Sequence, residues 1–255
     1  MTCRYFIELS FRGTNYHGWQ IQPNALTVQS LLNDALSVLL REPVFTTGAG
    51  RTDAGVHAVH FVAHFDSVQK GIESDPDILF RLNRILPEDI AVQRIIAVHP
   101  GAHCRFDAVS RTYIYRISRE KDPFITGLSW HIYGNMDTES MNRVSATLKE
   151  LSDFTSFSRL HSAAKTNNCR IMHAKWEEKE NLLLFTVKAD RFLRNMVRAL
   201  VGTMVEVGLG KLSEKEFRKI TERRDRSAAG VSAPARGLFL TSVEYPEGYF
   251  DIYKK

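Results

Sequence analysis

Cysteine is scarce in this chain of 255 residues, which contains only three. Cys3, Cys104 and Cys169 stand far apart in the sequence. An odd and widely spaced set of this kind supplies neither a disulfide framework nor the paired spacing of a zinc site. The sequence therefore indicates a protein of a reducing compartment.

Long apolar runs are also absent. The most apolar stretch, residues 192–209, is interrupted by Arg194, Asn195, Arg198 and Glu206, which makes it too polar to span a bilayer. The N-terminal residues MTCRYFIELSF lack a basic segment followed by an apolar one, so they do not form a signal peptide. We therefore expect a cytoplasmic protein with no membrane partner.

The composition shows no strong bias, with 44% hydrophobic and 25% charged residues, 15 Gly and 8 Pro. These values exclude a disordered, collagen-like or coiled-coil chain. The net charge is +5, and the excess is concentrated in residues 170–236, where 15 Lys and Arg stand against 9 Asp and Glu. A local basic surface of this kind is typical of nucleic-acid binding.

Strands and helices are interleaved along the chain. Residues 4–11 alternate with the period of a strand, and residues 28–40 repeat apolar side chains at helical spacing behind Thr27, a suitable N-cap. The same patterns predict further strands at 58–65, 90–98, 111–118, 171–177, 182–189 and 238–243, and further helices at 78–86, 138–151, 191–207 and 213–222. The short link after residue 177 requires an antiparallel pair, which favours an α+β fold over a parallel doubly wound sheet.

The pattern of elements is interrupted at residues 100–108, which read PGAHCRFDA. No repeat or low-complexity segment marks any other boundary. We therefore expect two parts, an N-terminal half at residues 1–104 and a C-terminal half at residues 105–255.

The segment GAGRTDAGVHA, residues 48–58, is the richest in chemistry. Its small residues let the backbone turn tightly and approach a ligand closely. Arg51 should keep the carboxyl group of Asp53 ionised, and an ionised carboxylate can act as a nucleophile or a general base. The alternative from the residues alone is a glycine-rich turn in which Asp53 only caps the loop.

Nucleotide and metal sites are not indicated. The glycines of residues 48–55 lack both the Gly-Lys-Ser/Thr ending of a phosphate loop and the third glycine of a dinucleotide fingerprint. On a strand at 58–65, only His60 and His64 share a face, and His57 has the opposite parity. We therefore expect ordinary strand histidines, no metal and no cofactor.

Two further groups are candidates for binding. Arg191, Arg194 and Arg198 fall on one side of the predicted helix at 191–207, and a half-buried Arg198 would need an anion, either a carboxylate or an RNA phosphate. Tyr113 and Tyr115 share a strand face and could stack on unpaired bases. Both groups have equally ordinary structural interpretations, as a solvated stripe and as core tyrosines.

Over nearly its whole length, the sequence resembles one family, the TruA-type tRNA pseudouridine synthases. GRTDAGVHA is the most specific motif of this resemblance. The other matching segments, in chain order, are GTNYHGWQ, LTVQSLLNDAL, LNRILPEDIAV, CRFDAVSRTYIYRI, LSDFTSFSR, FLRNMVRALVGTMVEVGLGKL and RDRSAAGVSAPARGLFL.

The resemblance implies a role for five residues. Asp53 matches the essential carboxylate, and Tyr113 matches the residue that stacks on the target uridine. Arg198 matches the basic residue expected to pair with the catalytic Asp, and Leu238 the apolar residue that lines the base pocket. Arg51 resembles the residue expected to hold the target nucleotide out of its stack.

The resemblance also implies the reaction, the fold and the partner. The family converts uridine to pseudouridine at positions 38, 39 and 40 of the tRNA anticodon stem-loop, without a cofactor, after flipping the base into a pocket. Its members are homodimers with a mixed, largely antiparallel sheet and flanking helices, in two similar halves around a central cleft. The alternatives are a catalytically silent tRNA-binding chaperone and a pseudouridine synthase for another RNA.

The first loop departs from the family pattern. Its usual sequence is Tyr-Asp-Gly-Thr, whereas this chain has Phe11, Arg12, Gly13 and Thr14. An acidic side chain is therefore replaced by a basic one at Arg12. This difference concerns how the loop contacts RNA, either more strongly or at a different feature of the tRNA. It does not concern the chemistry.

Overall fold

The computed structural model describes residues 2–159 and 166–250, and the chain divides into two compact units. Met1–Val109 and Leu240–Lys255 form the first unit, and Ser110–Phe239 forms the second. The described residues contain nine strands and five α-helices, which confirms the α+β class. The division into successive halves at residue 104 stays a prediction about domains.

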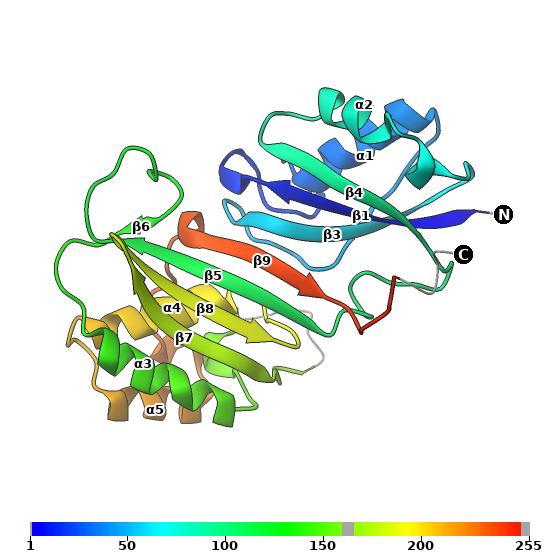
Figure 1. Cartoon of the computed structure of the whole chain (residues 1–255). Helices are drawn as coiled ribbons and strands as arrows, with labels where there is room; N and C mark the ends of the chain where they lie inside the picture. Colours follow the sequence, from blue (N-terminus) through cyan, green and yellow to red (C-terminus); the bar gives the residue numbers. More distant parts are fainter. Residues whose placement is uncertain (1, 160–165, 251–255) are drawn as a thin grey trace. The chain divides into compact units, whose positions relative to one another are not determined.

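The first unit is built on an antiparallel arrangement in which β1 lies between β3 and β4. Helices α1 and α2 cover one face of these strands (Figure 1). Side chains of α1 at helical spacing, from Val28 to Leu40, are buried against that face. The bounds are β1 Cys3–Phe11, α1 Val28–Leu40, β2 Thr47–Gly48, β3 His57–Ser67, α2 Ile78–Ile85 and β4 Ile90–Val98, with β2 paired to β3.

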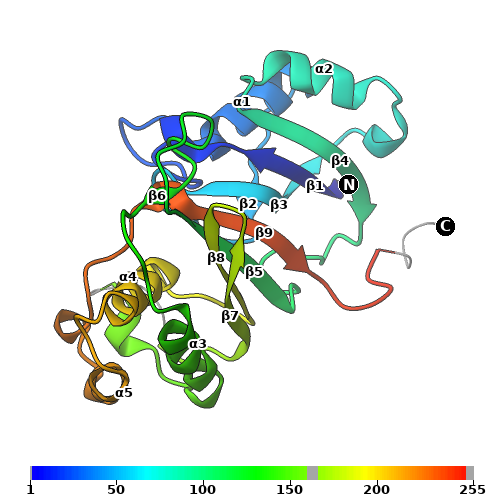
Figure 2. The same cartoon turned by 60° about the vertical axis from the view of Figure 1, so that its left-hand side comes forward.

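The second unit repeats this plan with its own strands. β8 lies between β5 and β7 in antiparallel pairs, and the short β6 pairs parallel to β5. Helices α3, α4 and α5 pack together on one side of these strands (Figure 2). The bounds are β5 Ser110–Ser118, β6 Trp130–His131, α3 Thr138–Thr147, β7 Ile171–Lys179, β8 Leu182–Ala189, α4 Met196–Gly208 and α5 Glu214–Arg223. The last strand, β9, Leu238–Glu244, begins in this unit and ends in the first.

The predicted elements are confirmed in kind and order, and the largest error is at the start of α4. The pattern predicts a helix from residue 191, but α4 begins at Met196 because Asn195 adopts a left-handed conformation with φ of 65°. The amide of Asn195 donates to Ser232 Oγ at 2.6 Å, which holds that conformation. Arg191 and Arg194 therefore precede the helix, and the predicted stripe of three arginines is wrong.

Two further boundaries differ from the prediction. The helix predicted at 138–151 is α-helical only to Thr147 and continues as a 3₁₀ turn over Leu148–Glu150. The short strands β2 and β6 have no periodic signal because each contains only two residues. None of the helices in the described ranges has the length and apolar character needed to cross a bilayer.

The segment that precedes β9 lies directly on α4. Gly202 faces the carbonyl oxygen of Val231 so closely that a Cβ atom would stand 1.8 Å from it. Thr203 Oγ1 accepts the N–H of Gly230 at 3.1 Å, and the carbonyl of Arg198 accepts the N–H of Ala233 at 2.9 Å. This contact fixes residues 230–233 against the first two turns of the helix.

We expect Gly202→Ala to lower the free energy of unfolding by about 1–3 kcal/mol, because the added methyl group must displace a backbone carbonyl. The loss should occur although alanine is the better helix former by about 1 kcal/mol. Urea unfolding would measure it, with Gly50→Ala as the control, since a methyl group added there would have no atom within 4 Å. Equal stability of Gly202→Ala and the natural protein would contradict the close approach.

Candidate active site

The loop that carries Asp53 connects β2 to β3 in the first unit. The N–H of Val56 donates to the carbonyl of Asp53 at 3.2 Å, and Gly55 takes a φ of 77° to close this turn. Arg51 is exposed and Asp53 is half-buried. The sequence-predicted Asp53 therefore begins a tight turn, and Arg51 lies two residues before it.

The first loop of the chain, residues 12–19, is hydrogen-bonded to the Asp53 loop. The N–H of Gly55 donates to the carbonyl of Tyr16 at 3.2 Å, and the N–H of Trp19 donates to the carbonyl of Thr52 at 3.3 Å. The N–H of Gly13 donates to Nδ1 of His57, which is only 1% exposed. Two bonds to the loop backbone, and a third to the side chain of His57 at the start of β3, therefore hold the turn from one side.

Two glycines make this approach between the loops possible. A Cβ on Gly13 would stand 2.0 Å from the carbonyl oxygen of Val56, and a Cβ on Gly18 would stand 2.3 Å from that of Thr52. Gly18 also has a φ of 89°, which side chains rarely allow. The segments with the motifs GTNYHGWQ and GRTDAGVHA thus pack directly against each other, backbone to backbone.

The other three predicted residues lie in the second unit. Tyr113 is on β5, opposite Val187 of β8, and its ring meets the ring of Phe192 edge to face with centroids 5.1 Å apart. Leu238 is the first residue of β9 and is 6% exposed. Arg198 lies in the first turn of α4 and is half-buried.

The segment 233–237 connects these residues within the second unit. Arg198 donates from Nε to the carbonyl of Ala233 at 2.7 Å, and the Tyr115 hydroxyl donates to the carbonyl of Pro234 at 2.7 Å. Gly237 packs on the Tyr115 ring, where a Cβ would stand 2.7 Å from Cζ. The sequence does not distinguish Tyr115 from Tyr113, but Tyr115 is fully buried and holds the segment that leads into Leu238.

Histidines and a cysteine form a cluster in the first unit that the sequence did not predict. The ligand-type atoms of His64, His103 and Cys104 all lie within 4.8 Å of one another. However, Nδ1 of His64 accepts the N–H of Cys104 at 3.3 Å, and Nδ1 of His103 accepts the N–H of Arg105 at 3.1 Å. A metal-bound histidine donates from its second ring nitrogen, so the cluster fits a hydrogen-bonded core better than a metal centre.

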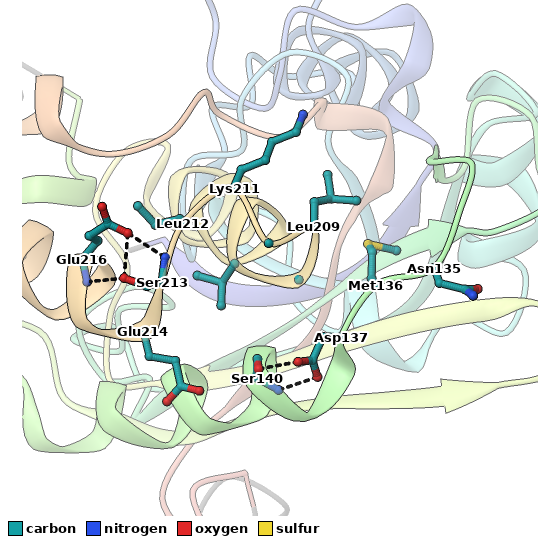
Figure 3. A pocket seen from close by; sticks show the side chains of 13 residues that line it. Asn135, Met136, Asp137, Ser140, Leu209, Lys211, Leu212, Ser213, Glu214 and Glu216 are labelled. Carbon is teal, nitrogen blue, oxygen red and sulfur yellow. Dashed lines mark hydrogen bonds between the residues drawn. The ribbon is translucent and has the colours of Figure 1, made fainter.

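A hollow of about 810 Å³ opens among the ends of α3, α4 and α5 (Figure 3). Its described lining contains none of the five predicted site residues. Asp137 accepts the N–H of Ser140 at 2.9 Å, and Glu216 accepts the N–H of Ser213 at 2.8 Å. These carboxylates cap α3 and α5, so the hollow is acidic and unsuited to an RNA phosphate.

Comparison with known proteins identifies the family. A family profile described as tRNA pseudouridine synthase matches residues 9–107 and 151–246.

The chain belongs to the tRNA pseudouridine synthase family.

Two similar proteins bear the name tRNA pseudouridine synthase A. The protein of Bacteroides thetaiotaomicron is 54% identical over 97% of this chain and 92% of its own length. That of Parabacteroides distasonis is 52% identical over 98% of both chains. A more distant relative with the same name, from Acetivibrio thermocellus, is 39% identical over 93% of this chain and 97% of its own.

The family profile covers some of the predicted site residues and not others. Asp53 lies in the first matched segment, and Arg198 and Leu238 lie in the second. Tyr113 lies between the two segments, although the relatives from Bacteroides and Parabacteroides match almost the whole chain. The predicted TruA-type family and its isomerase class are therefore confirmed, while the roles of the individual residues stay predictions.

Within the histidine cluster, the buried His64 gives an expectation for stability in acid. Burial, reinforced by the charge of Arg4, lowers the pKa of His64 to about 4. The unfolded chain binds a proton first, so the free energy of unfolding should fall as the pH drops from about 6.5 to about 4.

We expect His64→Asn to flatten the fall of the melting temperature between pH 6.5 and pH 4, because asparagine offers an acceptor near Nδ1 but does not titrate. Melting curves across this pH range would measure the slope. His131→Asn, at an exposed position, is the control and should keep the natural slope. Identical slopes in all three proteins would show that His64 does not bear the acid sensitivity.

Proposed function

We propose that this chain converts uridine to pseudouridine at positions 38, 39 and 40 in the anticodon stem-loop of tRNAs. The observation that carries the proposal is the GRTDAG turn, which presents Asp53 on a backbone fixed by two hydrogen bonds to a second motif of the family, with a third from that motif to the side chain of His57. The name of the relatives supports the reaction and the tRNA substrate.

The reaction breaks the bond between N1 of uracil and C1′ of the ribose and forms a bond between C5 and C1′. The proton on C5 is lost, and N1 ends protonated, so atoms and charge balance without an added reagent. Because a stacked base cannot turn over, the uridine must first leave the helix. Asp53 can act by adding to C6, by attacking C1′ or by removing a ribose proton.

The proposed roles follow the resemblance. Asp53 is the essential carboxylate, and Arg198 is its cationic partner. Tyr113 stacks on the flipped uracil, Leu238 lines the base pocket, and Arg51 holds the nucleotide out of its stack. The Nε bond from Arg198 to Ala233 supports this role, because it fixes a planar guanidinium whose donors can contact more than one acceptor.

We further propose that the protein is a cytoplasmic homodimer. The support is the resemblance, together with three cysteines that suit a reducing compartment. Light scattering coupled to size-exclusion chromatography would measure the mass, and we expect twice the 29.1 kDa of the chain.

We expect Asp53→Asn to keep tRNA binding but to lower the rate of pseudouridine formation on the order of 10⁴-fold, because the amide cannot act as nucleophile or base. The substrate is an unmodified tRNA transcript with uridine at 38, 39 and 40. Carbodiimide labelling and primer extension map the product. The matched control is Asp34→Asn, at an exposed position of α1, which should retain full activity.

The other outcomes favour the alternative functions. An active Asp53→Asn enzyme would remove Asp53 from the chemistry. Tight binding by the natural protein without product at any position would favour the tRNA-binding chaperone. Product in transcripts that lack uridine at 38, 39 and 40 would favour a synthase for another RNA site.

The first loop offers a phosphate contact at Arg12, where it departs from the family pattern. The backbone N–H of Arg12 donates to the carbonyl of Asp89 at 2.8 Å, so the loop is fixed where the side chain leaves it. Arg12 and Arg51 are both exposed, and within residues 2–159 and 166–250 neither is paired with a carboxylate. We propose that Arg12 binds a phosphate of the tRNA backbone.

We expect Arg12→Gln to reduce the slope of log K against log salt concentration by roughly one, the contribution of a single phosphate contact. Filter binding of tRNA at several salt concentrations would measure it. The control is Arg41→Gln, which should keep the natural slope. Arg41 caps the C-terminal end of α1, about 20 Å along the helix axis from the first residue of that helix. Equal slopes for Arg12→Gln and the natural protein would contradict the contact.

A further inference from the structure

The carbonyl group of Tyr16 is the point at which the first loop holds the Asp53 turn. It accepts the N–H of Gly55, two residues after Asp53, at 3.2 Å. Gly55 is also the residue whose positive φ closes the turn. A displacement of Tyr16 would therefore reach Asp53 through two peptide units.

Tyr16 is itself held by its side chain. The residue is 5% exposed, and its hydroxyl donates to Oδ1 of Asp89. Burial and the neighbouring carboxylate both raise the pKa of Tyr16, so the hydroxyl remains a donor. The ring thus connects the Asp53 turn to a carboxylate on the other side of the loop.

Asp89 binds the first loop at three places. Its carbonyl accepts the N–H of Arg12 at 2.8 Å, and its Oδ2 accepts the amide of Asn15 at 3.2 Å, in addition to the bond from Tyr16. Asp89 immediately precedes β4, and its neighbour Ile90 pairs with Phe11 of β1. The position of Asp89 is therefore set by the sheet.

We propose that Asp89 and Tyr16 are positioning residues for the reaction, forming a latch that holds the Asp53 turn to the sheet. This inference rests on the proposed function, in which Asp53 is the essential carboxylate. A carboxylate that must reach one atom of a flipped base loses much of its rate when it is misplaced by about 1 Å, up to about a hundredfold.

The latch has a matched comparison in the same motif. Asn83 lies six residues before Asp89 and makes two hydrogen bonds with Val92 of β4, at 2.8 and 2.9 Å. These bonds tie α2 to β4 and do not involve the loops at 12–19 or 51–56. Asn83→Ala therefore removes a comparable amount of bonding without touching the Asp53 turn.

The experiment compares Tyr16→Phe, Asp89→Ala, the double variant and Asn83→Ala. Tyr16→Phe removes only the hydroxyl and keeps the ring. For both latch variants we expect the single-turnover rate of pseudouridine formation to fall about tenfold to a hundredfold, with the Kd for tRNA within about twofold of the natural value. Asn83→Ala should lose stability but keep the rate.

The double variant tests whether the two residues act as one unit. Because both substitutions break the same bond, the double variant should be about as slow as Asp89→Ala. Multiplied losses in the double variant, or an Asn83→Ala enzyme slowed as much as Tyr16→Phe, would overturn the proposal and indicate a merely structural role.

Amide exchange at Gly55 separates this inference from the proposed function. We expect its N–H to exchange faster in Tyr16→Phe and unchanged in Asn83→Ala. If the natural protein forms no pseudouridine, the proposed function fails, and the exchange alone then decides the latch. Unchanged exchange at Gly55 in Tyr16→Phe would overturn it whatever the activity.

Discussion

The close approach of two backbone segments, residues 12–19 and 51–56, is the constraint on which the candidate site depends. A tight turn that carries a carboxylate has little stability of its own, because ordering its backbone costs conformational entropy that few local contacts offset. Here Gly13 and Gly18 lie where no Cβ would fit, and the peptide groups of Gly55 and Trp19 can therefore bond across the gap. The order of the Asp53 turn is thus supplied by a segment more than thirty residues earlier in the sequence.

The second unit uses the same device with different residues. Gly202 lets residues 231–233 lie against α4. Arg198 makes two hydrogen bonds with Ala233: its carbonyl accepts the N–H of Ala233, and its guanidinium donates to the Ala233 carbonyl. Arg198 was expected to need an anion, yet one of its donors is bound to a neutral carbonyl. A planar guanidinium can do both, because its donors point in fixed, separate directions. A lysine could also donate to the carbonyl and keep its charge, but it lacks the planar set of donors that holds a second acceptor in a defined direction.

The sequence predicts the elements well where periodicity is long, as in 28–40 and 90–98, and fails where a single side chain decides. The apolar pattern of 191–207 is continuous, but the left-handed Asn195 delays the helix, and this conformation depends on Ser232 far along the chain. Asp53 is found from its motif. Tyr16 and Asp89 are not, because their importance lies in a hydrogen bond between segments that are 73 residues apart. His64 and Cys104 were missed for the same reason.

The contacts also explain why the resemblance to the family is carried by separate motifs. GTNYHGWQ supplies Tyr16 and Gly18, GRTDAGVHA supplies Asp53 and His57, and LNRILPEDIAV supplies Asp89. In the structure these three segments form one hydrogen-bonded assembly in the first unit. A change at one of the contacting residues, such as Gly18 or Asp89, alters the space or the hydrogen-bonding groups available to the neighbouring segment. The three motifs therefore act as a single structural requirement, that of holding one carboxylate, and their joint presence is stronger support for the proposed chemistry than Asp53 alone.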